Sequence, residues 1–193
     1  MKIDIALDPK SIKEAIKKLK SVKYLMPKMV QEFTEEVAKW ITNRANDYIK
    51  NSDLGSLVKA EIMGGWNYEP IVGGIKVVNR AEKAVYVEFG VGIVGQSQAH
   101  PEASKEGYEY NVKSRAKFLG GSWSFRGKTG TLDLPMDSVE YAGIGEQLVF
   151  ITQGAKGVWY AYNAIVDAQM EIAKVNGGAI GKLWNDIKKR YIG

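Results

Sequence analysis

Cysteine is absent from this sequence, and histidine occurs only once, as His100. Without cysteine there can be no disulfides, thiolate metal sites or cysteine nucleophiles. A lone histidine cannot form the multi-ligand cage that zinc prefers in proteins. We therefore expect the protein to bind no metal and no cofactor.

Long apolar runs are lacking as well. The chain begins with alternating apolar and polar residues and reaches Pro9 without the apolar core of a signal peptide. No apolar run has the length that a membrane span requires. We expect a protein that is made and kept soluble, with no membrane partner.

Size and charge are those of an ordinary globular protein. The chain has 193 residues, of which 45% are hydrophobic and 25% charged, and its formal net charge is +5. This length suits one hydrophobic core, so we predict a single domain over residues 1–193. The mildly basic charge is compatible with contacts to DNA or to an acidic protein ring, but it is below that of a dedicated nucleic-acid binder.

Apolar residues at helical spacing predict helices at both ends of the chain. After a short opening strand at residues 3–7, a first helix is expected, which Pro27 should end. A longer helix should follow to about Lys50. Two more helices are predicted over residues 158–174 and 180–192.

The first of these helices has a basic face. Its lysines are Lys13, Lys17, Lys18 and Lys20. A face of this kind is usually solvated, and the alternative is a docking surface for an acidic neighbour.

Shorter runs between the helices predict strands. Three are expected at residues 58–63, 71–78 and 84–89, joined by glycine-containing turns as an antiparallel meander, and a fourth returns at residues 147–152. From about 92 to 146 glycine, serine and charge increase, which favours a long insert. We predict an α+β fold: a small antiparallel sheet of three to five strands, packed by N-terminal helices and a C-terminal helical pair, with a protruding loop or β-hairpin arm.

One short motif is the most informative part of the chain. Residues 84–92 read A-V-Y-V-E-F-G-V-G, and their alternation predicts a strand that Gly90 and Gly92 bring to an end. Upstream, residues 53–57 read D-L-G-S-L; downstream, residues 158–164 read V-W-Y-A-Y-N-A. The order of these segments carries more information than any one of them.

In this order the segments resemble the tail-completion (head–tail joining, or neck) proteins of long-tailed bacteriophages. In that family the last sheet strand typically reads A-x-Y-V-E-F-G-T-G, and a downstream helix opens with P-F-L-R-P-A. Here Val91 replaces the threonine, and residues 158–164 keep an aromatic residue and the final alanine but lack the arginine and both prolines. The resemblance covers most of the chain except residues 95–145.

The resemblance implies a structural virion protein, made in the cytoplasm of the bacterial host. Its copies would form a homo-oligomeric ring at the head–tail junction. Its partners would be other copies of itself and other neck, tail-tube or tail-terminator proteins, with genomic DNA in passing contact. The resemblance implies no chemistry, so we predict that the protein is not an enzyme.

Two ionisable residues nevertheless need a role. For Glu88 we expect a structural or inter-subunit ion pair, with Lys76 or Lys83 as neighbour, because such networks are the common fate of carboxylates on strands. His100 is expected to be a solvent-exposed loop residue. A hydrolase or metal enzyme built on Glu88 and His100 is the competing hypothesis, and loss of turnover in His100→Ala would support it.

The tail of the motif also spells G-x-G-x-x-G, at residues 90–95. A dinucleotide fingerprint must follow a strand and open a helix inside a βαβ unit. Residues 96–101 are not predicted to begin a helix, so we reject this interpretation.

The insert carries the last candidate site. Five basic residues and three aromatic residues lie between residues 113 and 131, with no acidic residue among them. This composition suits a protein interface, which we favour, and also a nucleic-acid-binding module that uses residues 113–128. The predicted interaction residues are Tyr86, Glu88, Phe89, Lys113, Arg115, Lys117, Phe118, Trp123, Phe125, Arg126 and Lys128.

Overall fold

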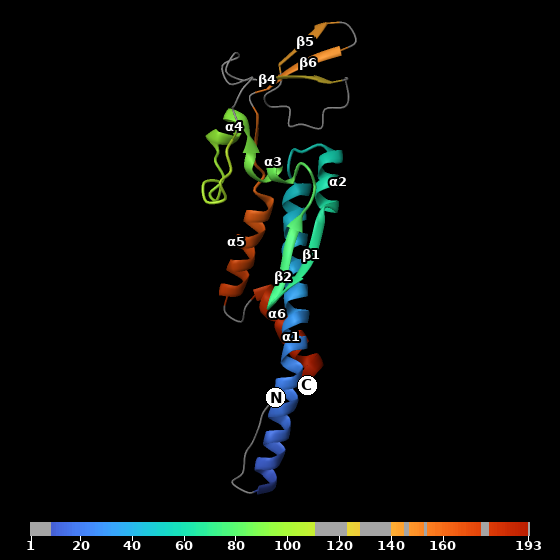
Figure 1. The fold of residues 1–193 in the computed structure, drawn as a ribbon, viewed down its shortest axis with the longest axis vertical. Coiled ribbons are helices and arrows are strands. Elements are labelled where there is room, and N and C mark those ends of the chain that lie inside the picture. The colour runs from blue at the N-terminus through green and yellow to red at the C-terminus, as the bar shows by residue number, and fades with distance from the viewer. Residues whose placement is uncertain are drawn as a thin grey trace. The chain divides into compact units, whose positions relative to one another are not determined.

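The computed structural model describes residues 9–110, 123–127, 140–144, 147–152, 154–174 and 178–192. The chain divides into two compact units. Unit 1 consists of Met1–Ile41, Tyr68–Val77 and Val166–Gly193, and unit 2 of Thr42–Asn67 and Val78–Ile165. The elements are labelled in Figure 1. A single domain remains a prediction.

Helix α1 runs without a break from Pro9 to Lys50 and contains Pro27 (Figure 1). The expectation that Pro27 would separate two helices is therefore wrong. Proline has a helical φ, so the turns on either side continue, although the hydrogen bond that its nitrogen would donate is lost.

Helix α2, Ser56–Gly64, replaces the strand predicted at residues 58–63. Its buried residues are Val58 and Ile62, four positions apart, which is the spacing of one helical face. The alternation of apolar residues that suggested a strand satisfies this spacing equally well. The side-chain amide of Asn79 donates to the carbonyl of Ile62 (2.8 Å) near the C-terminal end of α2.

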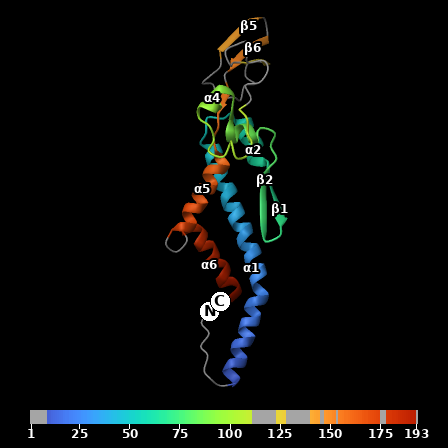
Figure 2. The same ribbon diagram turned by 60° about the vertical axis from the view of Figure 1, so that its left-hand side comes forward.

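Strands β1, Trp66–Ile71, and β2, Gly74–Asn79, form a two-stranded sheet, seen side by side in Figure 2. The strand predicted at residues 71–78 corresponds largely to β2. The two-residue connection contains Gly73 at φ 80°, a conformation that glycine adopts readily.

The motif at residues 84–92 is mostly helical. Helix α3, Ala84–Phe89, replaces the predicted strand, and strand β3, Gly90–Val91, and helix α4, Gly92–Ser97, follow it. In α3 the side chains of Val87 and Glu88 are buried, whereas those of Val85 and Tyr86 are exposed. Burial thus follows a helical turn, and the period of two that predicted a strand is not used.

Antiparallel strands occur within the predicted insert and directly after it. Strands β4, Trp123–Gly127, β5, Glu140–Ile144, and β6, Gln147–Thr152, form a sheet in the order β4-β6-β5. Adjacent strands pair antiparallel, with Phe125 opposite Phe150 and Tyr141 opposite Phe150. The strand predicted at residues 147–152 is confirmed.

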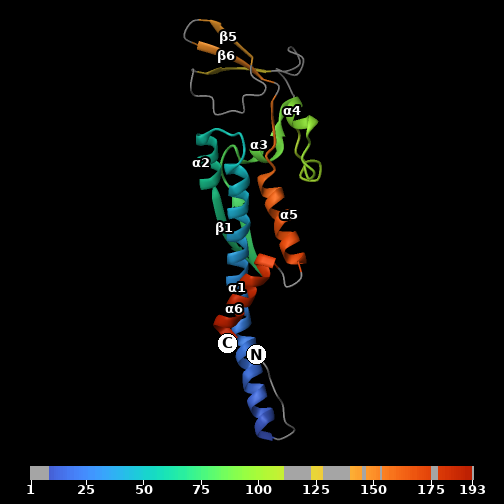
Figure 3. The same cartoon turned by 180° about the vertical axis from the view of Figure 1, so that it is seen from behind.

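The remaining elements complete an α+β protein, which confirms the predicted fold class. Strand β7, Gly154–Lys156, pairs antiparallel with β3, and helices α5, Tyr160–Ala173, and α6, Gly178–Ile192, follow. Figure 3 shows α5 and α6 in succession at the C-terminal end of the chain. Both C-terminal helices were predicted. Of the four strands predicted between the helices only those that correspond to β2 and β6 are present, and the described strands form three small sheets.

Unit 1 is held together by contacts between α1 and α6. The rings of Phe33 and Trp184 meet edge to face with centroids 5.3 Å apart. Arg190 forms an ion pair with Glu32, and the pKa of Tyr191 is raised by its hydrogen bond to Glu32 and by burial. These contacts hold α6 against the middle of α1.

Among the described residues, no helix is both long and apolar enough to cross a membrane.

Candidate functional site

Two segments far apart in the sequence lie side by side in unit 2. The N–H of Val158 donates to the carbonyl of Val87 (2.7 Å), and the N–H of Trp159 donates to that of Glu88 (3.2 Å). Strands β3 and β7 extend this contact, with Gly90 opposite Lys156. Residues 87–91 and 155–159 are therefore joined along their length by backbone hydrogen bonds, and we call this pairing the backbone ribbon. Its second segment leads directly into α5.

Gly157 allows this close approach. A Cβ at this position would lie 2.5 Å from the carbonyl oxygen of Glu88 and 2.7 Å from the carbonyl carbon of Phe89. Both are backbone atoms, so they cannot move aside as the end of a flexible side chain could. A residue with a side chain at position 157 would push the two segments apart.

The carboxylate of Glu88 caps α5. The first N–H groups of a helix have no intrahelical acceptor and carry partial positive charge. Here the N–H of Ala161 donates to Glu88 Oε2 and that of Tyr162 donates to Glu88 Oε1, both at 2.9 Å. Because the first turn of α5 contains no acidic residue, Glu88 supplies the negative charge from another part of the chain.

His100 is the third partner of this carboxylate. Its Nε2 lies 3.1 Å from Glu88 Oε1, and its Nδ1 accepts the N–H of Glu102 at 3.0 Å. A ring nitrogen that accepts a hydrogen bond carries no proton, so in this arrangement the imidazole is neutral and donates from Nε2 to Glu88. We call the group formed by Glu88, His100 and the N–H groups of Ala161 and Tyr162 the Glu88 cap.

The Glu88 cap is buried under aromatic rings. Glu88 is 8% exposed and His100 is 5% exposed. The ring of Phe89 lies 4.5 Å from that of His100 and stacks on Tyr108 at 4.6 Å, measured between centroids. Tyr162 meets His100 edge to face at 5.1 Å. Water is thus largely excluded, which strengthens the hydrogen bonds of the cap.

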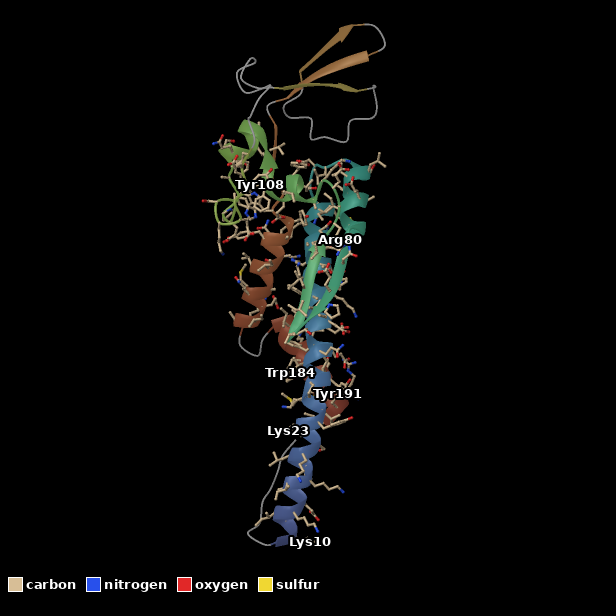
Figure 4. All side chains as sticks on the ribbon, viewed as in Figure 1. Lys10, Lys23, Arg80, Tyr108, Trp184 and Tyr191 are labelled. Carbon is tan, nitrogen blue, oxygen red and sulfur yellow. The ribbon has the colours of Figure 1, made fainter. Side chains whose placement is uncertain are left out.

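Two tyrosines connect this shell to the neighbouring backbone. The hydroxyl of Tyr108, labelled in Figure 4, donates to the carbonyl of Gly90 (2.6 Å), and burial raises the pKa of Tyr108. The hydroxyl of Tyr160 donates to the carbonyl of Ala84 (3.3 Å). Burial, and then the negative charge of Glu88, raise the pKa of Tyr160 well above its usual range, so both hydroxyls act as neutral donors.

The three donors of the cap use most of the hydrogen-bonding capacity of the Glu88 carboxylate. Each carboxylate oxygen accepts a backbone N–H, and one of them also accepts the imidazole N–H. Such an arrangement fixes the start of a helix and ties together residues 73 and 74 positions apart.

The sequence-based interpretation of these two residues needs correction. Glu88 pairs with neither predicted lysine, because Lys83 pairs with Glu61 and Lys76 pairs with Glu69. The prediction that His100 is a solvent-exposed loop residue is also wrong, since its ring is enclosed by aromatic side chains. Hydrogen-bond donors distant in sequence account for the first error, and aromatic neighbours distant in sequence account for the second.

No helix begins within residues 96–101, as predicted, because helix α4 begins inside the G-x-G-x-x-G motif and ends at Ser97. A short helix, α4, does follow strand β3. Strand β3, however, pairs antiparallel with β7, whereas a dinucleotide-binding unit requires parallel strands joined by a crossover helix. The antiparallel pairing of β3 and β7 therefore does not fit a dinucleotide-binding unit.

The predicted interaction residues fall into three groups. Tyr86 is exposed on α3, while Glu88 and Phe89 belong to the cap and its aromatic shell. Trp123, Phe125 and Arg126 lie on β4. Lys113, Arg115, Lys117, Phe118 and Lys128 lie outside the described residues.

Sequence reasoning did not predict that His100, Ala161 and Tyr162 join Glu88. One feature of the sequence could have suggested it. The helix that begins near residue 160 has no Ser, Thr, Asp or Asn immediately before it and no acidic residue in its first turn, so its N-terminus needs a cap from elsewhere.

No protein-family model, no curated protein and no solved structure matches this chain. Within the part of the chain that the structure describes, no group of three or more His, Cys, Asp or Glu residues could hold a metal ion.

Proposed function

We propose that the protein is a structural virion protein of a tailed bacteriophage, whose copies form a ring at the head–tail junction. One observation carries the proposal. The two segments that resemble the tail-completion family, residues 84–92 and 158–164, are joined by the Glu88 cap. The glutamate comes from the first segment, and both backbone donors come from the second.

This contact gives the pair of motifs a physical reason to occur together. A buried carboxylate needs several donors, and a helix N-terminus needs an acceptor, so each segment satisfies the other. The element that carries the glutamate is a helix, which differs from the strand that the resemblance implies. The order of the motifs and their joint role support the proposal independently of that difference.

The exposed side of α3 is the surface that we assign to a neighbouring copy. Val85 is 51% exposed and Tyr86 is 56% exposed, and both lie on the helix whose buried face holds Glu88. A ring requires one surface of each copy to meet a different surface of the next. Tyrosine is among the side chains enriched in such interfaces. The basic and aromatic residues between 113 and 128 are assigned to the neighbouring copy or the adjoining ring.

Electron microscopy and mass photometry of the purified full chain test the proposal. We expect closed rings, and we expect Tyr86→Arg to shift the population to monomers while the circular dichroism spectrum is unchanged. Ile172→Arg, which changes an exposed residue of α5 in unit 1, is the matched control and should leave the rings intact.

Two results would contradict the proposal. One is a chain that stays monomeric at high concentration and is absent from virions probed with antibodies. The other is tight DNA binding with a steep salt dependence, which would favour the alternative nucleic-acid-binding module. The same salt titration applied to a variant with Lys113, Arg115 and Lys117 changed to serine would locate that binding.

A further inference from the structure

The N-terminal half of α1 exposes a stripe of apolar side chains. We call it the α1 stripe; it consists of Ile12, Ile16, Leu19, Met26 and Val30, which are 39–54% exposed. Figures 1 and 2 show this part of α1 extending beyond the other described elements of unit 1. An apolar stripe of this length on a charged helix indicates an interaction surface.

The spacing of the α1 stripe is that of a helix–helix seam. Its members follow one another at intervals of four and three residues, with Lys23 at the one seam position that is not apolar. Intervals that alternate between four and three are the heptad pattern by which one helix packs along another. The same series continues to Phe33, which packs on Trp184 of α6. Because a helix, α6, covers the seam at Phe33, we expect the exposed part of the seam to bind a helix as well.

Charge restricts the choice of partner. Between residues 10 and 28 the helix carries seven lysines and a single acidic residue, Glu14. All seven lysines are exposed; Lys10 and Lys23 are labelled in Figure 4, where their side chains extend away from the helix. A partner that covers the α1 stripe must therefore be acidic beside its own apolar positions.

Three other occupants fit less well. A second copy would place seven lysines against seven more, which is repulsive. A lipid surface requires a broad apolar face, whereas this stripe is narrow and Lys23 interrupts it at its centre. A nucleic acid would match the lysines but would leave the apolar seam without a role.

We propose that the α1 stripe binds an acidic amphipathic helix of another protein. About three heptads of that helix would lie along roughly 27 Å of α1. Its apolar positions cover the stripe, and its flanking carboxylates face the lysines. A carboxylate opposite Lys23 fixes the register, as a single polar residue in a helix seam does. The inference does not depend on the proposed ring, because it concerns a different surface.

The test uses the full chain and a synthetic probe. The probe is a fluorescent 21-residue peptide of three heptads, with leucine and isoleucine at the seam positions and glutamate at the flanking positions. Its control has lysine in place of each glutamate. Fluorescence anisotropy should show that only the acidic peptide binds and that raising the salt concentration weakens its binding.

Matched variants locate the binding surface. Ile16→Glu combined with Leu19→Glu removes apolar contacts and adds repulsion, so the affinity should fall at least about tenfold. Ile172→Glu changes another exposed apolar residue, which lies on α5, and should bind as the unchanged chain does. Tyr86→Arg, which tests the ring, should also leave peptide binding unchanged.

Several results would overturn the inference. Among them are equal binding of both peptides, absence of binding, and unchanged binding by the Ile16 and Leu19 double variant. Tighter binding of anionic vesicles or of DNA, lost in the same double variant, would assign the stripe to those partners instead. Self-association that depends on Ile16 and Leu19 would assign it to a second copy.

Discussion

The Glu88 cap buries a charged side chain, whereas the α1 stripe exposes apolar side chains. At the cap a charged group is buried, and every donor that it needs comes from the same chain. Beside the α1 stripe the charged lysine side chains lie in solvent, and the stripe itself consists of exposed apolar side chains. Burial of a charge requires a complete set of partners, whereas exposed apolar side chains remain available to another molecule. The first region should therefore govern stability, and the second should govern association.

Replacing Glu88 should have the largest effect on stability. Glu88→Ala leaves His100 and two backbone N–H groups without their acceptor in a buried site, and should lower the free energy of unfolding by about 3–5 kcal/mol, since each unsatisfied donor costs about 1–3 kcal/mol. Glu88→Gln keeps an acceptor and should cost only about 1–2 kcal/mol. Urea unfolding followed by circular dichroism measures both values, and hydrogen exchange at Ala161 and Tyr162 should accelerate in the alanine variant.

A surface ion pair provides the control for this experiment. Glu61 pairs with Lys83 at 2.9 Å in an exposed position, so Glu61→Ala should have a much smaller effect than Glu88→Ala. If the two alanine variants lose the same stability, the Glu88 cap does not stabilise the fold as we describe.

Glycine substitutions test the backbone ribbon beside the cap. Gly157→Ala should destabilise the protein by about 1–3 kcal/mol, because the new Cβ would overlap backbone atoms of residues 88 and 89. Gly64→Ala, where a Cβ meets nothing within 4 Å, should be neutral or slightly stabilising at the end of helix α2. Thermal unfolding of the two variants gives the comparison, and an unchanged Tm for Gly157→Ala would contradict the close approach.

A less buried cap at α6 sharpens the comparison with Glu88. The N–H of Ala179 donates to Glu171 Oε2 at 2.6 Å, and this bond, followed by the contact with Lys174, lowers the pKa of Glu171 below 4.5. A lowered pKa in the folded state means that the stabilisation is complete above pH 4.5 and is lost as the pH falls through the folded-state pKa. Stability measured from pH 6 down to pH 3 should decline less steeply in Glu171→Gln. Equal slopes would show that this carboxylate does not cap α6.

The smallest effect on stability is expected at the α1 stripe. Ile16→Ser combined with Leu19→Ser should change the free energy of unfolding by no more than about 0.5 kcal/mol, because both side chains are already exposed. Urea unfolding measures it. A loss of several kcal/mol would mean that the stripe is covered within the chain, which would contradict our proposal for its partner.

The parts of the fold that could be predicted from sequence are those with a strong local period. The C-terminal helices and strand β6 follow from such periods. Residues 58–63 and 84–89 are short runs in which apolar residues fit both a period of two and a helical turn. In α2 and α3 tertiary contacts favour the helix over the strand. One such contact is the hydrogen bond from the side-chain amide of Asn79 to the end of α2.

The candidate site could be predicted only in part. Glu88 was predicted to form a structural or inter-subunit ion pair, but its partners come from positions 100, 161 and 162, and two of them are backbone groups. Because every residue except proline has a backbone N–H, the amino-acid type does not show which N–H groups will bind Glu88. His100 could not be placed because its burial depends on Phe89 and Tyr162, which reach it only in the folded chain.

The backbone ribbon beside the cap also has a consequence for the segment between its two sides, residues 92–154, part of which we expect to tolerate replacement. Hydrogen bonds between residues 87–91 and 155–159 hold the two ends of that segment together at its base. The entropy of closing a loop grows only slowly with its length, about 0.6 kcal/mol for each doubling. We therefore expect that a change in the length of the chain between residues 111 and 153 leaves the Glu88 cap and α5 intact.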